Sequence, residues 1–239
     1  MIDYLKYQKE IEDILKDTII IKHIPHSSLE FPSNYDDHTL KRIYGLDYKI
    51  QNLKLADLHV DYLFKDIIGI EIKAKYSRMY CDVEKYQDDK KEVMSKYGLG
   101  YIYTKNILNN KPYRRNLKQE KKDIDAYYDN HHEKLTYETK KIISQGKKVL
   151  ILDLHSYSDE QAILIGKKGP FTDICIGINN DAPVDQRILN VIIKMIEDKG
   201  YTYQINYPYS GAILPNNLTP TEKDCTSSIM IEVNKRVYL

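Results

Sequence analysis

The segment Lys148–His155, with the sequence KVLILDLH, constrains the possible folds of this chain more than any other segment. Its apolar residues run continuously instead of alternating with polar ones, and such a run is typical of a strand covered on both faces. Strands of this kind belong to sheets that have helices packed on their two sides. The segment therefore indicates an α/β layered domain.

Strand and helix patterns alternate along the rest of the chain, as that architecture requires. Strands are predicted over residues 18–26, 69–75, 100–104, 148–155, 172–178, 201–206 and 228–233. Helices are predicted over residues 4–16, 47–65, 119–145 and 184–198. Gly146 follows the third of these helices and is expected to end it.

The chain has 239 residues, a length that predicts one domain over residues 1–239. Its 36 basic and 35 acidic residues nearly cancel, which argues against a nucleic-acid-binding protein. No apolar stretch reaches the length of a membrane span, and the charged N-terminus lacks the apolar core of a signal peptide. We therefore expect neither nucleic acid nor a membrane as a partner, and the oligomeric state stays open.

The cysteines exclude one kind of metal site. Cys81, Cys175 and Cys225 are odd in number and far apart in sequence, which argues against a disulfide framework and against a thiolate zinc site. A reducing compartment suits such a chain, and the cytoplasm is the expected location.

Polar residues stand on three of the predicted strands. His26 ends the first strand, Asp153 and His155 end the central one, and Glu232 lies in the last. Ligands of open α/β sheets bind beyond the carboxyl ends of the strands. Each residue alone also fits a structural role, as a hydrogen-bonded histidine or an edge-strand glutamate, but their coincidence on one predicted sheet favours a shared site.

Two histidines and a carboxylate are the ligand set of hydrolytic zinc sites, which keep a fourth position for water. A further carboxylate is then needed as general base. Asp57 and Asp61 are candidate ligands because they are four residues apart and share one face of the predicted helix, although an ordinary helix surface has the same spacing. Glu30, four residues after His26, is a rival ligand.

Short motifs along the chain resemble the N-formylglutamate amidohydrolase family. They are Pro25-His26-Ser27-Ser28 and the segments 57–64, 77–84, 98–103, 127–132, 152–156, 206–211 and 229–235. The motifs follow one another in the family's order from about residue 20 to the last residue. Each motif is short, and it is the shared order over most of the chain that makes the resemblance specific.

The resemblance implies a fold and a set of ligands. That family is similar in fold to the zinc carboxypeptidases and aspartoacylases, which have a three-layer α/β/α sandwich around a mixed, mostly parallel sheet. It implies that His26 and His155 bind Zn²⁺ or another divalent ion, with Asp61 the preferred third ligand. It also implies Glu232 as general base and acid, and Asp153 is a candidate for orienting His155 because both face the same side of their strand.

One motif departs from the pattern. Enzymes of the aspartoacylase type carry Asn-Arg after an aspartate, whereas here Glu84-Lys85 follows Asp82-Val83. Lysine offers a point charge instead of a planar fork, so bidentate capture of a carboxylate is lost. Arg78 is the expected substitute in substrate binding and oxyanion stabilisation. The remaining candidates for substrate binding are Lys85, Arg115, His132 and Tyr209.

The predicted function is metal-dependent hydrolysis of the C–N amide bond of a small N-acyl amino acid. The resemblance implies N-formyl-L-glutamate as the substrate, and formate and glutamate as the products. One alternative is the same chemistry on another N-acyl amino acid, or on a peptide or cell-wall fragment. A second alternative is a non-catalytic binding protein that keeps the fold and has lost the metal.

Overall fold

The computed structural model describes Tyr7, Ile11 and residues 13–179 and 184–239, which form two compact units. Unit 1 contains the described residues of Met1–His23, with Leu63–Glu71 and Leu135–Leu239. Unit 2 contains Ile24–Tyr62 and Ile72–Lys134. The expected single domain over residues 1–239 stays a prediction.

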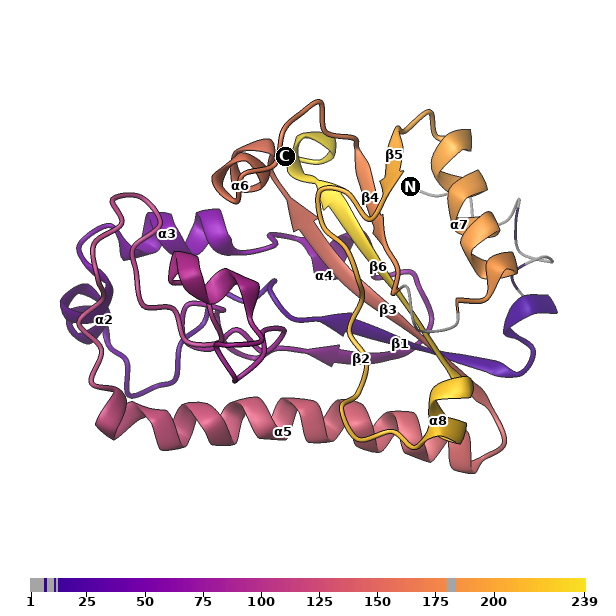
Figure 1. Cartoon of the computed structure of the whole chain (residues 1–239), viewed down its shortest axis with the longest axis horizontal. Helices are drawn as coiled ribbons and strands as arrows, with labels where there is room; N and C mark the ends of the chain where they lie inside the picture. Colours follow the sequence, from indigo (N-terminus) through magenta and orange to yellow (C-terminus); the bar gives the residue numbers. More distant parts are fainter. Residues whose placement is uncertain (1–6, 8–10, 12, 180–183) are drawn as a thin grey trace. The chain divides into compact units, whose positions relative to one another are not determined.

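Six strands form one mixed sheet (Figure 1). They are β1 Thr18–Ile24, β2 Ile70–Lys73, β3 Lys148–Tyr157, β4 Ile174–Gly177, β5 Tyr203–Ile205 and β6 Thr226–Asn234, in the spatial order β2-β1-β3-β6-β4-β5. The pairs β1–β3, β3–β6 and β4–β5 are parallel, and β4 runs antiparallel to β6. The apolar segment that opened the sequence argument is β3, and it is buried along nearly its whole length.

Helices cover both faces of this sheet, so the predicted α/β class is confirmed. The helices of unit 1 are α6 Asp159–Leu164, α7 Gln186–Asp198, α8 Pro220–Asp224 and the last part of α5 Leu117–Ser144, with the 3₁₀ turn η2 Lys235–Val237 near the C-terminus. Gly146 follows α5 with a φ of 73°, as expected of a glycine that ends a helix. Of the predicted helix over 4–16, the structure describes Tyr7, Ile11 and residues 13–16, and all of these except residue 16 are helical.

The two faces of the sheet carry different kinds of side chain. An apolar cavity of about 160 Å³ is lined by Ile20 of β1, Leu150 and Leu152 of β3, and residues of α7 such as Val191. Even-numbered side chains of β1 and β3 therefore point towards α7. Because side chains alternate along a strand, the odd-numbered polar residues at the ends of these strands emerge on the opposite face.

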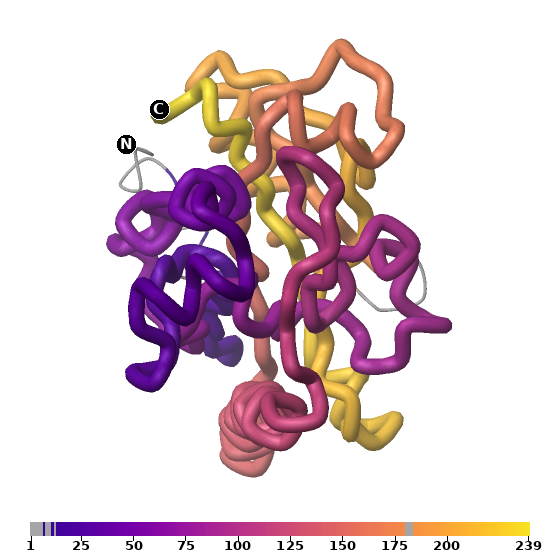
Figure 2. The backbone as a smooth tube through the Cα atoms, turned by 90° about the vertical axis from the view of Figure 1, so that its left-hand side faces the viewer, coloured from indigo at the N-terminus to yellow at the C-terminus, as the bar shows by residue number. Residues whose placement is uncertain are grey.

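Unit 2 is built from short helices and long loops around a core rich in tyrosine. Its helices are α2 Asp37–Tyr44, α3 Tyr48–Leu55, α4 Val60–Leu63, the 3₁₀ helix η1 Val93–Tyr97 and the first part of α5. Residues 74–92 contain neither helix nor strand, and Figure 2 shows this part of the chain as loops. Its core packs Tyr44, Met79 and Tyr103 in one cluster and Tyr80, Val83 and Ile124 in another.

Two predicted elements differ from the observed ones. Residues 100–104 form no strand, and Tyr103 makes only an isolated bridge with Leu99. The single helix predicted over 47–65 is divided into α3 and α4.

The division of that helix matters for the site. Ala56, which ends α3, has an extended backbone, and His59 has a φ of 61°. The N–H of Asp57 leaves the helical pattern and donates to the carbonyl oxygen of His26 at 2.9 Å. The break therefore brings the backbone of Asp57 to His26.

A close backbone approach also supports the site. Gly177, in β4, has no room for a side chain, because an added Cβ would lie 2.2 Å from the carbonyl oxygen of Gly211. Two residues beyond Gly211, the Ile213 N–H donates to the Asp153 carboxylate at 3.0 Å. Gly177 therefore lets the loop that supports Asp153 lie against the sheet.

We expect Gly177→Ala to lower the free energy of unfolding by at least about 1–3 kcal/mol, because the added methyl group overpacks a buried backbone contact. Gly169→Ala is the matched control, since its added Cβ would meet Phe171 at an ordinary 3.7 Å. Guanidinium denaturation of the two variants checks this. Equal stability of both variants would contradict the close packing at Gly177.

Candidate metal and active site

The carboxyl end of β3 carries a hydrogen-bonded histidine pair in unit 1. Asp153 Oδ1 lies 2.7 Å from Nδ1 of His23 and 2.9 Å from Nε2 of His155. The other oxygen, Oδ2, accepts the N–H of Ile213. All three side chains of the pair and its aspartate are buried. Register explains the arrangement, because His23 is the β1 partner of Asp153 and both therefore point to the same face.

Glu232 joins this group from the neighbouring strand. It is the register partner of His155 in the parallel pair β3–β6, so the two side chains leave the sheet on the same face. Glu232 is also buried. We call His23, Asp153, His155 and Glu232 the β3 cluster.

The charge of Asp153 is stabilised by its neighbours. Burial alone raises the pKa of a carboxyl group, but the two imidazoles, His155 foremost, hold the pKa of Asp153 well below its usual range. Asp153 is therefore a carboxylate, and it fixes the orientation of the His155 ring.

A second buried group forms around His26 in unit 2, and we call His26, Asp57, Asp82 and Glu84 the His26 cluster. Nε2 of His26 lies 2.8 Å from Asp82 Oδ1 and 3.7 Å from Glu84 Oε2. Nδ1, on the other side of the ring, lies 3.5 Å from Asp57 Oδ2. The imidazole is therefore held between carboxylates.

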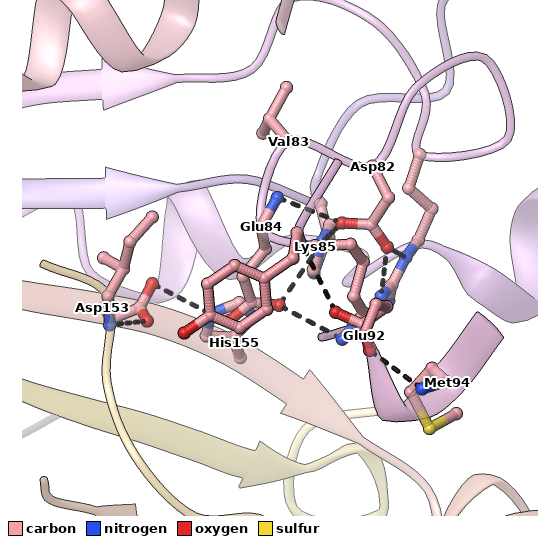
Figure 3. Close-up of polar contacts among 12 residues, drawn as sticks. Asp82, Val83, Glu84, Lys85, Glu92, Met94, Asp153 and His155 are labelled. Atoms are coloured by element: carbon pink, nitrogen blue, oxygen red, sulfur yellow. Dashed lines mark hydrogen bonds and ion pairs between the residues drawn. The ribbon is translucent and has the colours of Figure 1, made fainter. Parts of the chain in front are cut away.

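Asp82 is the centre of this cluster (Figure 3). Its Oδ2 accepts hydrogen bonds from Nε and Nη2 of Arg78, at 3.1 and 2.8 Å, and from the hydroxyl of Tyr103 at 2.9 Å. Its Oδ1 faces His26 and accepts the N–H of Glu84 at 3.2 Å. Both oxygens of this fully buried carboxylate are thus occupied.

The protonation of the His26 cluster follows from these contacts. Burial raises the pKa of Asp82, but the Arg78 guanidinium and His26 lower it well below its usual range. Burial and the charge of Arg78 lower the pKa of His26, but Asp82 and Asp57 outweigh them and raise it. The two aspartates therefore favour a positive charge at this position, which either a protonated imidazole or a bound cation supplies.

The two candidate arginines, Arg78 and Arg115, make different contacts. Arg78 donates to Asp82 through Nε and Nη2 and to the carbonyl oxygen of Leu55 through Nη1. Arg115 donates to Glu120 and to the carbonyl oxygens of Met79 and Tyr80, and its side chain is 3 % exposed. Arg115 is therefore held within the tyrosine-rich core, and its role in substrate binding stays a prediction.

The other three candidates for substrate binding also have defined places. Lys85 lies 3.9 Å from Glu84, and although burial lowers the pKa of Lys85, Glu84 and Asp82 raise it above its usual value. His132 on α5 places Nε2 2.7 Å from the carbonyl oxygen of Val83, so it supports the loop that carries Asp82 and Glu84. In unit 1, the ring of Tyr209 packs edge-on against Tyr157.

Asp61 and Glu30 lie outside the candidate ion-binding groups of the described residues, whereas Asp57 belongs to the His26 cluster. Asp61 lies in α4, is partly exposed and pairs with Lys73. Within the described part of the chain it belongs to none of the groups of residues that are close enough to share an ion. Glu30 is exposed and belongs to none of these groups either. The family resemblance had favoured Asp61, whereas the spacing on one predicted helix treated Asp57 and Asp61 alike.

The donor set of the His26 cluster fits a divalent cation. One ligand atom from each of His26, Asp82 and Glu84 lies within 4.8 Å of the others. Imidazole nitrogens and carboxylate oxygens are the donors that catalytic zinc sites use. Asp57 faces the nitrogen of His26 that Asp82 does not contact.

Sequence reasoning missed four residues that lie in or against these clusters. His23 contacts Asp153, Asp82 and Glu84 approach His26, and Tyr103 donates to Asp82. His23 could have been found from the sequence. It lies three residues after Ile20 in the predicted first strand, so the two side chains point to opposite faces of the sheet. Tyr103 carried no such signal, since the chain contains 22 tyrosines.

The mixed sheet with helices on both faces makes this an α/β protein. Its buried imidazole–carboxylate clusters are suited to a metal ion. The sequence model of the N-formylglutamate amidohydrolase family matches residues 19–239, and the chain belongs to this family. It is therefore a member of a family of hydrolases.

Two solved structures share the fold. The crystal structure of N-formylglutamate amidohydrolase from Ralstonia eutropha JMP134 superposes with a TM-score of 0.71 at 21% identity, covering 92% of this chain and 83% of that one. A gene product of Agrobacterium tumefaciens, Atu2144, superposes with a TM-score of 0.62 at 16% identity, covering 92% and 80%. The search of curated proteins gave no match.

Across the described residues, no helix combines the length and the apolar character needed to cross a membrane.

We expect Asp82→Asn to lower the free energy of unfolding by about 3–5 kcal/mol, because it leaves Arg78 buried without its countercharge. Asp129→Asn, which removes an exposed carboxylate from α5 in the same unit, should change it by less than about 0.5 kcal/mol. Guanidinium denaturation measures both values. A variant at Asp82 as stable as the control would show that Asp82 does not organise the cluster.

Proposed function

We propose that this protein is a zinc-dependent amidohydrolase that cleaves the C–N amide bond of a small N-acyl amino acid. N-formyl-L-glutamate is the substrate that the family's description suggests, with formate and L-glutamate as products. The free cysteines, two of them buried, suit a reducing compartment, and we propose the cytoplasm as its location.

One observation carries the proposal. In each cluster a histidine presents Nε2 to a buried aspartate, Asp82 for His26 and Asp153 for His155. Metal-bound histidines commonly have this arrangement, in which a carboxylate holds one ring nitrogen and the other binds the ion. We therefore propose Nδ1 of His26 and Nδ1 of His155 as ligands, with Asp57 as the carboxylate ligand.

Chain connectivity supports a shared ion. His23 is the register partner of Asp153, and His26 follows three residues later, a span of at most about 11 Å. His155 lies two residues after Asp153 on β3. The carboxyl ends of β1 and β3 thus supply both proposed histidine ligands.

When bound, the zinc ion lowers the pKa of a coordinated water to about 7 and polarises the acyl carbonyl group. Glu232, beside His155, accepts the proton that the attacking water releases. It then delivers this proton to the leaving nitrogen, so that the amide C–N bond breaks to a carboxylate and an amine. Arg78, which pairs with Asp82, is the proposed cation for the oxyanion or the substrate carboxylate.

The roles of Asp57 and Asp61 are tested as a pair. Asp57→Ala should reduce bound zinc to less than a tenth of one equivalent, whereas Asp61→Ala should keep the wild-type stoichiometry. Atomic emission spectroscopy after dialysis measures the zinc content. Loss of zinc from the Asp61 variant alone would restore the ligand that the family resemblance implied.

His155→Ala should lose zinc as well as activity, because it removes a proposed ligand. Circular dichroism shows whether the variant keeps its fold. A folded variant that retains one equivalent of zinc would make His155 a structural residue.

Glu232→Gln should keep zinc and lose about 10²- to 10⁴-fold or more in kcat, because the amide cannot carry the proton. Formate release from N-formyl amino acids measures kcat. Turnover at the wild-type rate would overturn the assignment of Glu232 as general base and acid. A wild-type protein that binds zinc and hydrolyses no N-acyl amino acid would point to the binding-protein alternative.

A further inference from the structure

In unit 1, part of the loop after β5 lies across the sheet beside the β3 cluster. Asp153, Met230 and Gly177 form one row across β3, β6 and β4, because Met230 is the register partner of both of the others. At one end of this row, a Cβ added to Gly177 would lie 2.2 Å from the carbonyl oxygen of Gly211. At the other end, the Ile213 N–H donates to Asp153. The loop therefore follows this row from β4 to β3.

The next row along the strands carries the proposed chemistry. Glu232 is the register partner of His155 on β3 and of Cys175 on β4, and all three lie two positions from the members of the first row. Residues two apart on a strand share a face and are separated by about 6–7 Å. The loop therefore lies beside His155 and Glu232, on the side of Asp153.

Asn179, two residues after β4, holds this part of the loop in place. Its Oδ1 accepts the N–H of Ala212 at 3.1 Å, and its Nδ2 donates to the carbonyl oxygen of the same residue at 2.9 Å. One side-chain amide thus binds both backbone polar groups of Ala212. The preceding Gly211 has a φ of 83°, a conformation that suits glycine, and a Cβ there would lie 3.2 Å from Oδ1 of Asn179.

The residue after Ala212 makes the contact that reaches the site. The N–H of Ile213 donates to Oδ2 of Asp153 at 3.0 Å, while His23 and His155 contact the other oxygen, Oδ1. Because the terminal torsion of an aspartate side chain is soft, contacts on both oxygens are needed to fix the plane of its carboxylate. A displaced Ile213 N–H would therefore loosen the hold of Asp153 on the His155 ring.

We infer that Asn179 is a positioning residue of the hydrolase. Through Ala212 and Ile213 it keeps Asp153 in the orientation that presents Nδ1 of His155 to the metal ion. This inference rests on the proposed function and extends its machinery to the loop. Since the effect passes through Asp153, it is expected on zinc affinity before any substrate binds.

The test is a double-mutant cycle on zinc affinity, measured by competition with a fluorescent chelator. Asn179→Ala should weaken zinc binding by about tenfold and Asp153→Asn by about 10- to 100-fold, as for other groups that orient a metal-bound histidine. Because Asn179 acts through Asp153, the double variant should bind zinc within about threefold of Asp153→Asn alone.

Asn190→Ala is the matched control, because it removes an exposed asparagine from α7 of the same unit. It should leave zinc affinity unchanged. Wild-type affinity in Asn179→Ala overturns the inference. Losses that multiply in the double variant also overturn it, since Asn179 would then act independently of Asp153. If Asn179→Ala does not fold, Asn179→Asp takes its place, because it keeps the shape of the side chain and loses the donated hydrogen bond.

Failure of the proposed function gives a different result. A wild type that binds no zinc refutes the zinc-dependent hydrolase, and the metal-free protein then decides the inference. In the wild type, Asp153 holds the ring proton of His155 on Nε2. In Asn179→Ala, the Ile213 amide hydrogen should exchange at least about tenfold faster, and nitrogen NMR should show the His155 proton divided between Nε2 and Nδ1. An unchanged exchange rate, or a ring proton that stays on Nε2, contradicts the inference.

Discussion

The need to pair buried carboxylates governs the His26 cluster and the β3 cluster alike. Asp82 and Asp153 are fully buried, and an isolated ion at either position would be costly to desolvate. Each is stabilised by an imidazole and by a backbone N–H, and Asp82 also by Arg78. These pairings fix the two histidine rings before any ligand binds, and the orientation of each ring decides which nitrogen is presented to an ion.

The fold was largely predictable because its strongest signals are local. The apolar run of β3 and the alternation of strands with helices indicate a layered sheet, and both depend on residues close in sequence. The break between α3 and α4 was not predictable in this way. It depends on the hydrogen bond from Asp57 to His26, two residues that are 31 positions apart, and on the positive φ of His59.

The site was predictable where residues lie at strand ends and less so where loops supply them. His26, Asp153, His155 and Glu232 could be proposed from their places on predicted strands. The choice between Asp57 and Asp61 could not be made, because helical spacing treats the two as equivalent until the break in the helix separates them. Arg115 was proposed because arginine is rare in this chain, and the contacts that it makes with Glu120 and two carbonyl groups could not be read from the sequence.

The most direct test of the account is anomalous X-ray diffraction at the zinc edge from crystals of the zinc-loaded protein. The account predicts one strong peak at about 2.0–2.2 Å from Nδ1 of His26, an oxygen of Asp57 and Nδ1 of His155, with Asp82 and Asp153 still bonded to the opposite nitrogens. A peak coordinated by His26, Asp82 and Glu84 without His155, or crystals that bind no zinc at these residues, would contradict it.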